Sequence, residues 1–502
     1  MVEPQISHTD LRETIDKHFE WLLVRENGKT FPVRCNEIDF ATTDDRTHFS
    51  FVDDLGLHTW RLNNVEHSNG EIVLDVAGAF GKNRETLRLV PREPASLLAA
   101  EVELARLKKA NEIAHVLAAG VPGTKVVRVA LSNENGRIAH IFFKRGTWKH
   151  GAMMADVSGT MTHEALLATA ILWRQKLASR KKDPVSEVCI AAEKRSAKNL
   201  QKLHALMTVG VQGYVKVFET RRTKEPPEII ELPVKKVRDL WRERPRKLSL
   251  PHVPFPSETA QRMIDLAPEK IDVIYSKQGE TLRFLGLPFA RVRSMLGTEK
   301  AWFGTGKEKR VLNNASWQAF CEFVEDLKNH RQPGAANKRH ELYRAAPEAW
   351  LEAILRQNIR LLDPNLILSP IYNQFRASSD KIDLLALRRD GRLVIIELKT
   401  TPDREAVFQA ADYWRKIELQ RRSGNLRAIR AFGDAEILDK PALVYIAAPA
   451  LSFHRDFEFF ARMLVPEIEL WRWELHENWR GKIKVIARRD YRDFADQNGR
   501  HS

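Results

Sequence analysis

The run Leu-Val-Ile-Ile-Glu-Leu-Lys at residues 393–399 constrains the fold of this 502-residue chain more than any other feature. Its almost unbroken aliphatic character is typical of a strand that is buried on both faces of a sheet. The run follows Asp390-Gly391, a strong signal for a two-residue hairpin turn, and a second apolar run, KIDLLAL, precedes that turn. We therefore expect two adjacent antiparallel strands inside a larger, covered sheet.

The rest of residues 339–502 predicts an α/β domain built around these two strands. The segment PEAWLEAILRQNIRLL is an amphipathic helix, since Pro347 suits its first turn and Trp350 and Leu351 lie on its apolar face. The further expected elements are the strands NLILSPIYNQF, PALVYIAA, IELWRWEL and KIKVIARR and helices at 403–422 and 453–464. The predicted order is α-β-β-β-α-β-α-β, with a mixed central sheet.

Three charged residues stand at the ends of the two central strands. Glu397 and Lys399 are two residues apart and therefore share one face of their strand, and Asp383 heads the preceding strand beside them. Two close carboxylates repel each other unless a divalent cation lies between them, and carboxylate oxygens suit Mg²⁺ or Mn²⁺. A neighbouring lysine can orient or deprotonate an attacking water, or stabilise a charged transition state. The pattern favours hydrolysis of a phosphodiester.

These residues resemble the PD-(D/E)xK nuclease superfamily, whose restriction-endonuclease-like core has the order αβββαβ. The resemblance implies that Asp383 and Glu397 bind the metal and that Lys399 is the catalytic lysine. In the helix that follows, Gln409 and Tyr413 match the QxxxY motif of RecB-like branches, where it supports the active site and contacts DNA. The resemblance covers about residues 340–490 and implies a metal-dependent nuclease.

Some positions of the resemblance stay open. The first helix of the superfamily often supplies a further acid, and EAWLE offers both Glu348 and Glu352, of which the spacing favours Glu348 as a metal ligand. Asp380 competes with Asp383 as the strand-end acid, and Ile382 replaces the proline of the superfamily motif. We expect Glu348, Asp383, Glu397, Lys399 and Gln409 to form the catalytic site.

Simpler interpretations exist for each of these residues. Strand-end acids and lysines often form surface ion pairs worth only about 0–1 kcal/mol. An acid in a first helical turn, such as Glu348, complements the helix dipole, and Gln409 and Tyr413 at i and i+4 could pack together on one helix face. The metal site is nevertheless favoured, because RLVII is too apolar for an exposed strand and a buried unmatched acid is costly.

The upstream half of the chain predicts further domains. Residues 1–95 predict a helix at 9–25 followed by a small antiparallel β unit. Residues 96–220 predict an α/β domain with the same element order as the C-terminal one. Where the C-terminal domain has Glu-Leu-Lys, this middle α/β domain reads MMADVS, without glutamate or lysine. It is therefore a candidate for a degenerate nuclease-like domain that binds without cutting.

Two more segments and the charge balance complete the organisation. Residues 221–256 are rich in Lys, Arg and Pro and predict an exposed linker or arm, and 257–338 predict a small α-rich domain. The chain has a formal net charge of +15, whereas residues 341–502 hold 27 Lys or Arg against 24 Asp or Glu. Most of the positive charge lies upstream, as expected if the earlier domains bind a polyanion such as DNA.

The remaining composition excludes several classes of protein. The three cysteines, Cys35, Cys189 and Cys321, are widely spaced, which argues against a disulfide framework or structural zinc and favours the cytoplasm. No apolar run is long enough to cross a membrane.

We expect an Mg²⁺- or Mn²⁺-dependent deoxyribonuclease whose upstream basic domains bind the substrate. The alternatives are a catalytically silent nuclease fold that binds nucleic acid or a partner, and cleavage of RNA. The superfamily serves repair, restriction and antiviral defence, and the sequence does not separate them.

Overall fold

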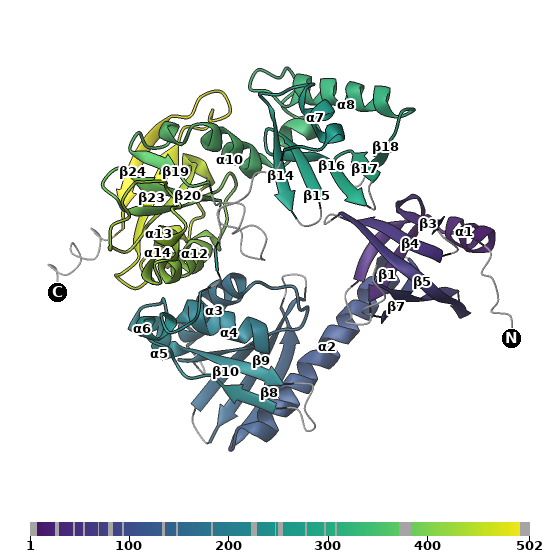
Figure 1. Ribbon diagram of the computed structural model, residues 1–502. Coiled ribbons are helices and arrows are strands. Elements are labelled where there is room, and N and C mark those ends of the chain that lie inside the picture. Colours follow the sequence, from purple (N-terminus) through teal and green to yellow (C-terminus); the bar gives the residue numbers. More distant parts are fainter. Residues whose placement is uncertain are drawn as a thin grey trace.

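The protein is a mixed α/β, multidomain molecule with four sheets (Figure 1). The computed structural model describes residues 8–25, 30–43, 46–53, 56–68, 70–78, 84–92, 95–132, 136–146, 149–181, 184–221, 228–245, 247–248, 255–276, 279–295, 298–306, 309–370 and 383–491. Within these ranges no helix is long and apolar enough to span a membrane. Cys35, Cys189 and Cys321 carry free thiols.

The N-terminal unit is a seven-stranded antiparallel sheet with one short helix. The order is β2-β1-β7-β6-β5-β4-β3. Its elements are α1 (His8–Asp16), β1 (Glu20–Arg25), β2 (Thr30–Arg34), β3 (Ile38–Thr43), β4 (Arg46–Asp53), β5 (Gly56–Ser68), β6 (Glu71–Ala77) and β7 (Arg84–Pro91). The predicted helix at 9–25 was wrong in its second half. EWLLVR alternates buried and half-buried side chains between β2 and β7, and this burial outweighs helix propensity.

The middle domain, residues 95–240, contains a six-stranded mixed sheet in the order β13-β12-β11-β10-β9-β8. Its elements are α2 (Ala95–Gly120), β8 (Thr124–Leu131), β9 (Ile138–Arg145), β10 (Lys149–Asp156), α3 (His163–Ala178), β11 (Val188–Glu193), α4 (Lys194–His204), α5 (Val209–Tyr214), β12 (Val215–Arg221), β13 (Glu228–Glu231) and α6 (Val237–Leu240). The element order predicted for 96–220 is present.

The segment predicted as an exposed linker is partly built into this domain. β13 pairs antiparallel with β12 as the edge strand of the sheet. After α6, the Trp241 ring contacts Trp414 of the C-terminal domain at a centroid distance of 5.8 Å. The prediction of a linker for residues 221–256 rested on their basic and proline-rich composition and overlooked the short apolar stretches that make these contacts.

The third unit is a β-sheet domain, so the prediction of a small α-rich domain at 257–338 was wrong. Its antiparallel sheet has the order β14-β15-β16-β17-β18. The elements are α7 (Glu258–Ile264), β14 (Ile271–Ser276), β15 (Gly279–Phe284), β16 (Leu287–Met295), β17 (Thr298–Phe303), β18 (Arg310–Leu312), α8 (Trp317–His330) and α9 (Glu341–Arg344). The apolar residues of these strands bury one face against α7 and α8, which a search for helical periodicity overlooks.

The C-terminal domain, residues 347–491, has the predicted element order around a six-stranded mixed sheet, β19-β20-β21-β22-β23-β24. Its elements are α10 (Pro347–Gln357), β19 (Leu366–Leu368), β20 (Leu384–Arg388), β21 (Leu393–Leu398), α12 (Ala406–Arg422), α13 (Asn425–Ala428), β22 (Leu443–Pro449), α14 (Phe457–Ala461), β23 (Glu469–Leu475) and β24 (Val485–Asp490). The Asp390-Gly391 turn joins β20 to β21 as predicted. Gly391 has φ 83°, and a Cβ atom there would lie 2.9 Å from the carbonyl oxygen of Glu436.

The middle and C-terminal sheets share one topology. From β8 to β13 the successive pairings are antiparallel, antiparallel, parallel, parallel and antiparallel. From β19 to β24 they follow the same series. The helices match as well, because α2 and α10 precede the sheets, α3 and α12 follow the third strands, and α4 and α14 follow the fourth.

These two domains pack through equivalent helices. In Figure 1, α3 and α4 lie against the side of the C-terminal domain that carries α12 and α14. One hydrophobic core contains residues from both sheets and from these helices. Met207, after α4, forms an antiparallel bridge with Leu464, after α14. Thr208 N donates to Met463 O at 2.8 Å and Val465 N to Leu206 O at 2.9 Å. The contact is therefore symmetric, and we infer a local two-fold relation between the domains.

Candidate active site

Asp383 and Glu397 lie side by side on neighbouring strands. Leu384 on β20 pairs with Ile396 on β21, so the next residues beyond this pair, Asp383 and Glu397, are opposite each other. Asp383 Oδ2 accepts a hydrogen bond from the Leu398 amide at 2.9 Å. Glu397 is only 3% exposed, because the strand before it is buried throughout. The hairpin register thus brings together the two acids that the sequence singled out.

Lys399 reaches back over Glu397 from the end of β21. Its Nζ lies 3.0 Å from Glu397 Oε1 and 2.8 Å from Asp403 Oδ2. It also donates a hydrogen bond of 2.7 Å to Gln409 Oε1 on α12. All three donor positions of the ammonium are therefore directed by named acceptors, which fixes the side chain although it is charged and nearly buried.

The site holds more negative than positive charge. Burial and the neighbouring Asp383 carboxylate raise the pKa of Glu397 well above its ordinary value, although Lys399 opposes this shift. Burial also acts against the Lys399 ammonium, but the carboxylates of Glu397, Asp403 and Glu348 outweigh it and raise the pKa of Lys399. The charged form of Lys399 is accordingly favoured, and the acids around it attract further positive charge.

The two acids of the first helix have different surroundings. Glu348 lies in the first turn of α10 and is half-buried, and its charge acts on Lys399. Glu352, one turn later, is 2% exposed and lies 3.8 Å from Arg283 Nη1 of β15. Glu348 therefore acts on Lys399 through its charge, whereas Glu352 is directed toward the preceding domain.

Gln409 and Tyr413 lie one turn apart on α12, over the ends of β20 and β21. Gln409 accepts the hydrogen bond from Lys399 described above. Burial, followed by the charges of Glu397 and Asp383, raises the pKa of Tyr413, so its phenol stays protonated. The QxxxY motif thus supplies one acceptor that holds the lysine and one neutral hydroxyl close to the acids.

Asp403 belongs to the site although sequence reasoning did not select it. Besides its ion pair with Lys399, its Oδ1 accepts a hydrogen bond of 2.7 Å from the Glu405 amide, which fixes the turn into α12. The signal that could have found it is the i,i+4 spacing from Lys399 across a loop that returns over the strand end.

The donor set fits a hard divalent cation. Oε2 of Glu397 is buried and has no hydrogen-bond partner among the residues that the structure describes. Such an atom is costly to bury unless a cation binds it. Asp383 lies opposite Glu397 on the neighbouring strand, and carboxylate oxygens are the ligands that Mg²⁺ and Mn²⁺ prefer. Glu348, Asp383 and Glu397 do not, however, bring one oxygen each within 4.8 Å of one another, so an ion would have to draw them together.

A second group of possible metal ligands lies between the two similar domains. His163, Glu164 and Asp412 place one ligand atom each within 4.8 Å of one another. Asp412, however, is already paired with Arg415 at 2.7 Å and Lys416 at 2.5 Å. Burial would favour its neutral form, but these cations and His163 keep the pKa of Asp412 far below its usual value. This group fits an ion-pair network at the domain interface better than a metal site.

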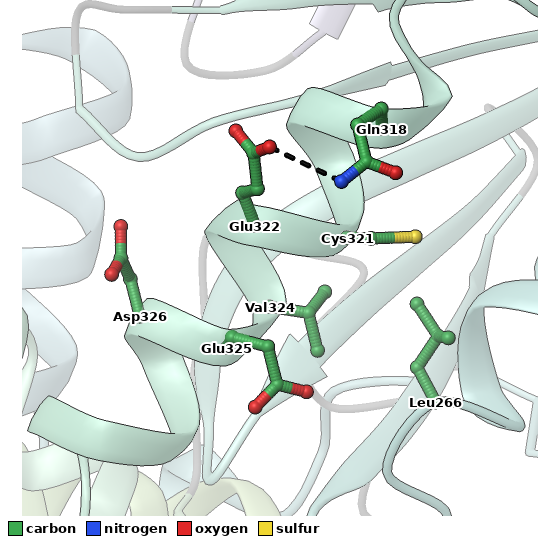
Figure 2. A pocket seen from close by; sticks show the side chains of 7 residues that line it. All are labelled: Leu266, Gln318, Cys321, Glu322, Val324, Glu325 and Asp326. Carbon is green, nitrogen blue, oxygen red and sulfur yellow. Dashed lines mark hydrogen bonds between the residues drawn. The ribbon is translucent and has the colours of Figure 1, made fainter.

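A separate hollow lies on α8, far along the chain from these residues. Figure 2 shows Gln318, Cys321, Glu322, Val324, Glu325 and Asp326 along the helix, with Leu266 opposite. Gln318 Nε2 donates to Glu322 Oε1 at 3.2 Å. Three acids around this hollow of about 330 Å³ would repel a nucleic acid, so it is no candidate for substrate binding.

Asp380 and Ile382 lie outside the described residues. Searches of protein-family models, of curated proteins and of solved structures found no match to this chain.

Proposed function

We propose that this protein is an Mg²⁺- or Mn²⁺-dependent nuclease of the PD-(D/E)xK type that hydrolyses phosphodiester bonds of DNA. The observation that carries the proposal is the Lys399 ammonium 3.0 Å from a buried Glu397 carboxylate, with Asp383 on the neighbouring strand. The mixed sheet with α10, α12 and α14 supports a restriction-endonuclease-like fold for the C-terminal domain.

The proposed roles follow from the position of each side chain. Asp383, Glu397 and Glu348 would hold the metal, which when bound makes water more acidic and polarises a phosphoryl oxygen. The surrounding carboxylates raise the pKa of Lys399, which supports a role for its ammonium in orienting the attacked phosphate and stabilising the developing charge. Gln409 and Asp403 hold Nζ in place for this task.

DNA is the proposed substrate because of the charge distribution. Most of the net charge of +15 lies before residue 341, whereas the charges of the C-terminal domain are nearly balanced. Basic upstream domains provide the sequence-independent attraction that phosphate backbones require. The middle domain, which lacks the acid–lysine group, is proposed as a degenerate copy that binds and does not cut.

The test is cleavage of labelled single- and double-stranded DNA and of RNA with Mg²⁺, Mn²⁺ or EDTA. We expect metal-dependent cleavage of DNA that falls about 10²–10³-fold in Lys399→Ala. Lys482→Ala, an exposed lysine of the same domain, is the matched control and should cleave normally. Cleavage that survives Lys399→Ala or EDTA would contradict the proposal. DNA binding without cleavage or metal uptake would instead support the catalytically silent alternative, and preferential cleavage of RNA would correct the substrate.

A further inference from the structure

A basic groove runs along the junction of the middle and C-terminal domains. It consists of two neighbouring cavities of about 410 and 480 Å³, which share Leu172, Lys176 and Arg404 in their walls. We call the two together the interdomain groove. Its cations are Arg128, Lys176, Arg180, Arg404 and Arg455, against one acid, Asp456. Within the described part of the chain, Arg128, Lys176 and Arg180 form no ion pair, so their charge is available to an anionic ligand.

One wall of the cavity of about 410 Å³ is aromatic. The rings of His140 on β9 and Trp173 on α3 stack with centroids 4.2 Å apart. Phe142 meets Trp173 edge-on at 5.6 Å, and the Arg180 guanidinium lies 5.4 Å from the Phe142 ring centre. His140, Phe142 and Trp173 all line the cavity and are only partly buried. Cations beside half-exposed rings suit a ligand that has both a phosphate and a flat base.

The groove occupies the position in the middle domain where the C-terminal domain has its acids. Ile138, the first residue of β9, lines the cavity of about 410 Å³ and lies opposite Asp156, just as Asp383, directly before β20, lies opposite Glu397. The cavity then follows β8, β9 and α3, the equivalents of β19, β20 and α12. In the middle domain the apolar Ile138 thus stands where the C-terminal domain has Asp383, and basic side chains line the cavity beside it.

The groove is joined directly to the candidate active site. Arg404 follows Asp403, the residue whose carboxylate holds Lys399. The Arg404 Nη2 atom donates to Thr169 Oγ1 of α3 at 3.3 Å, and Thr162 Oγ1 lies 3.5 Å from Glu405 Oε2. The catalytic loop 399–405 thus forms part of the groove wall, and a strand bound in the groove would continue toward Lys399.

We propose that the interdomain groove holds an unpaired nucleotide of the same nucleic-acid strand that is cleaved at Glu397 and Lys399. Its phosphate contacts Arg128, Lys176, Arg180 and Arg404, and its base packs on the His140–Trp173 wall. The inference rests on the proposed function and deepens it, because it makes the substrate single-stranded, or unpaired near the cut. A cavity of about 410 Å³ is of the size that takes a small ligand, whereas a paired base within a duplex has no free face to offer.

The test is binding of the full-length protein in EDTA, where cleavage plays no part. Fluorescence anisotropy is measured with a labelled single-stranded DNA 20-mer and with a blunt duplex of the same sequence. We expect Trp173→Ala to weaken binding of the single strand about 5- to 150-fold, the range for loss of one stacked base, and to leave duplex binding unchanged. Arg128→Glu with Arg180→Glu should weaken it at least as much. Arg195→Glu, an exposed charge change on α4 of the same domain, is the matched control.

Each other outcome would overturn the inference. The inference fails if the parent protein does not bind the single strand, or if the groove variants weaken single-strand and duplex binding equally. It also fails if Arg195→Glu weakens binding as much as the groove variants do. A free deoxynucleotide monophosphate that displaces the 20-mer at micromolar concentration would assign the groove to a free nucleotide instead. Because the readout needs no metal or cleavage, a failure here leaves the nuclease proposal standing. If the protein binds the single strand in this way but never cleaves it, the nuclease proposal fails and the groove inference stands.

Discussion

The middle and C-terminal domains share one topology, but their equivalent strands β10 and β21 end in different residues. In the C-terminal domain, the end of β21 presents Glu397 and Lys399 to Asp383. In the middle domain, the end of β10 presents Asp156 opposite Ile138. Val157 and Leu398 are each buried on the outer face of their sheet, so Asp156 and Glu397 both point to the inner side, toward α3 and α12.

The two acids are satisfied in different ways. Asp156 accepts hydrogen bonds from the amides of Ser158 and Gly159, each at 2.9 Å, and from Met161 at 3.2 Å, so the loop itself satisfies its charge. Glu397 has a lysine on one oxygen and no described hydrogen-bond partner on the other. The same backbone can therefore support a loop-fixing aspartate or a buried acid with one oxygen left unbonded, and the neighbouring side chains determine which one it is.

The largest contrast is expected between amide substitutions at the two equivalent acids. Glu397→Gln removes a proposed metal ligand and should lower the rate of DNA cleavage about a thousandfold, equivalent to about 4 kcal/mol of transition-state stabilisation. Asp156→Asn should leave the rate within about threefold and cost about 1–3 kcal/mol of stability, because charged hydrogen bonds to the loop are weakened. Rates from gel assays and melting curves measure both, and an equal loss of activity in the two variants would remove the distinction between the domains.

A second difference concerns how the free energy of unfolding depends on acid pH. Burial lowers the pKa of His204, at the end of α4 in the middle domain, to about 4. The folded state thus binds fewer protons than the unfolded state, so stability is complete above pH 6.5 and falls as the pH decreases from 6.5 to about 4. The loss should reach about 3 kcal/mol. Urea unfolding across this range should show this slope, and His204→Gln should flatten it. An unchanged slope would assign it to other groups.

The ion pair that holds Lys399 gives a third comparison. Asp403→Asn should lower cleavage about 10- to 100-fold, as loss of a supporting partner commonly does. Because Asp403 raises the pKa of Lys399, the alkaline limb of the pH–rate profile should also move to lower pH, which a purely structural defect would not cause. Asp403→Glu should restore part of the activity. A lower rate with an unmoved pH profile would count against a positioning role.

The smallest contrast separates the two acids of α10. Glu348→Gln should reduce activity by about tenfold or more through weaker metal binding, with little change in melting temperature. Glu352→Gln should instead cost about 1–3 kcal/mol of stability, since it leaves the buried Arg283 with fewer partners, and should keep the rate per folded molecule. The opposite pattern would exchange the roles of these two acids.

The C-terminal strands and the nearness of Asp383 to Glu397 were predictable from sequence because their signals are local. The Asp390-Gly391 turn fixes the register of β20 and β21, and a fixed register alone places Asp383 beside Glu397. The repeated element order also predicted a mixed middle sheet correctly. The choice between Glu348 and Glu352 needed the third unit, because Arg283 on β15 is the group that attracts Glu352.

Features that depend on long-range packing were missed. EWLLVR and the strands of 257–338 became strands through neighbours that local propensity does not report. Asp403 acquires its role from the course of a loop, and the interdomain groove exists only once α3 and the loop 399–405 are packed together. Sequence periodicity contains no information about such contacts.

The most direct test of the difference between the domains is a crystal of the full-length protein soaked in Mn²⁺ and measured for anomalous scattering. We expect a peak bound by Asp383 and Glu397, and none at Asp156 or at the His163–Glu164–Asp412 group. An empty Asp383–Glu397 site, with the ion at either of the other two positions, would contradict the proposal that the C-terminal domain alone carries the metal chemistry.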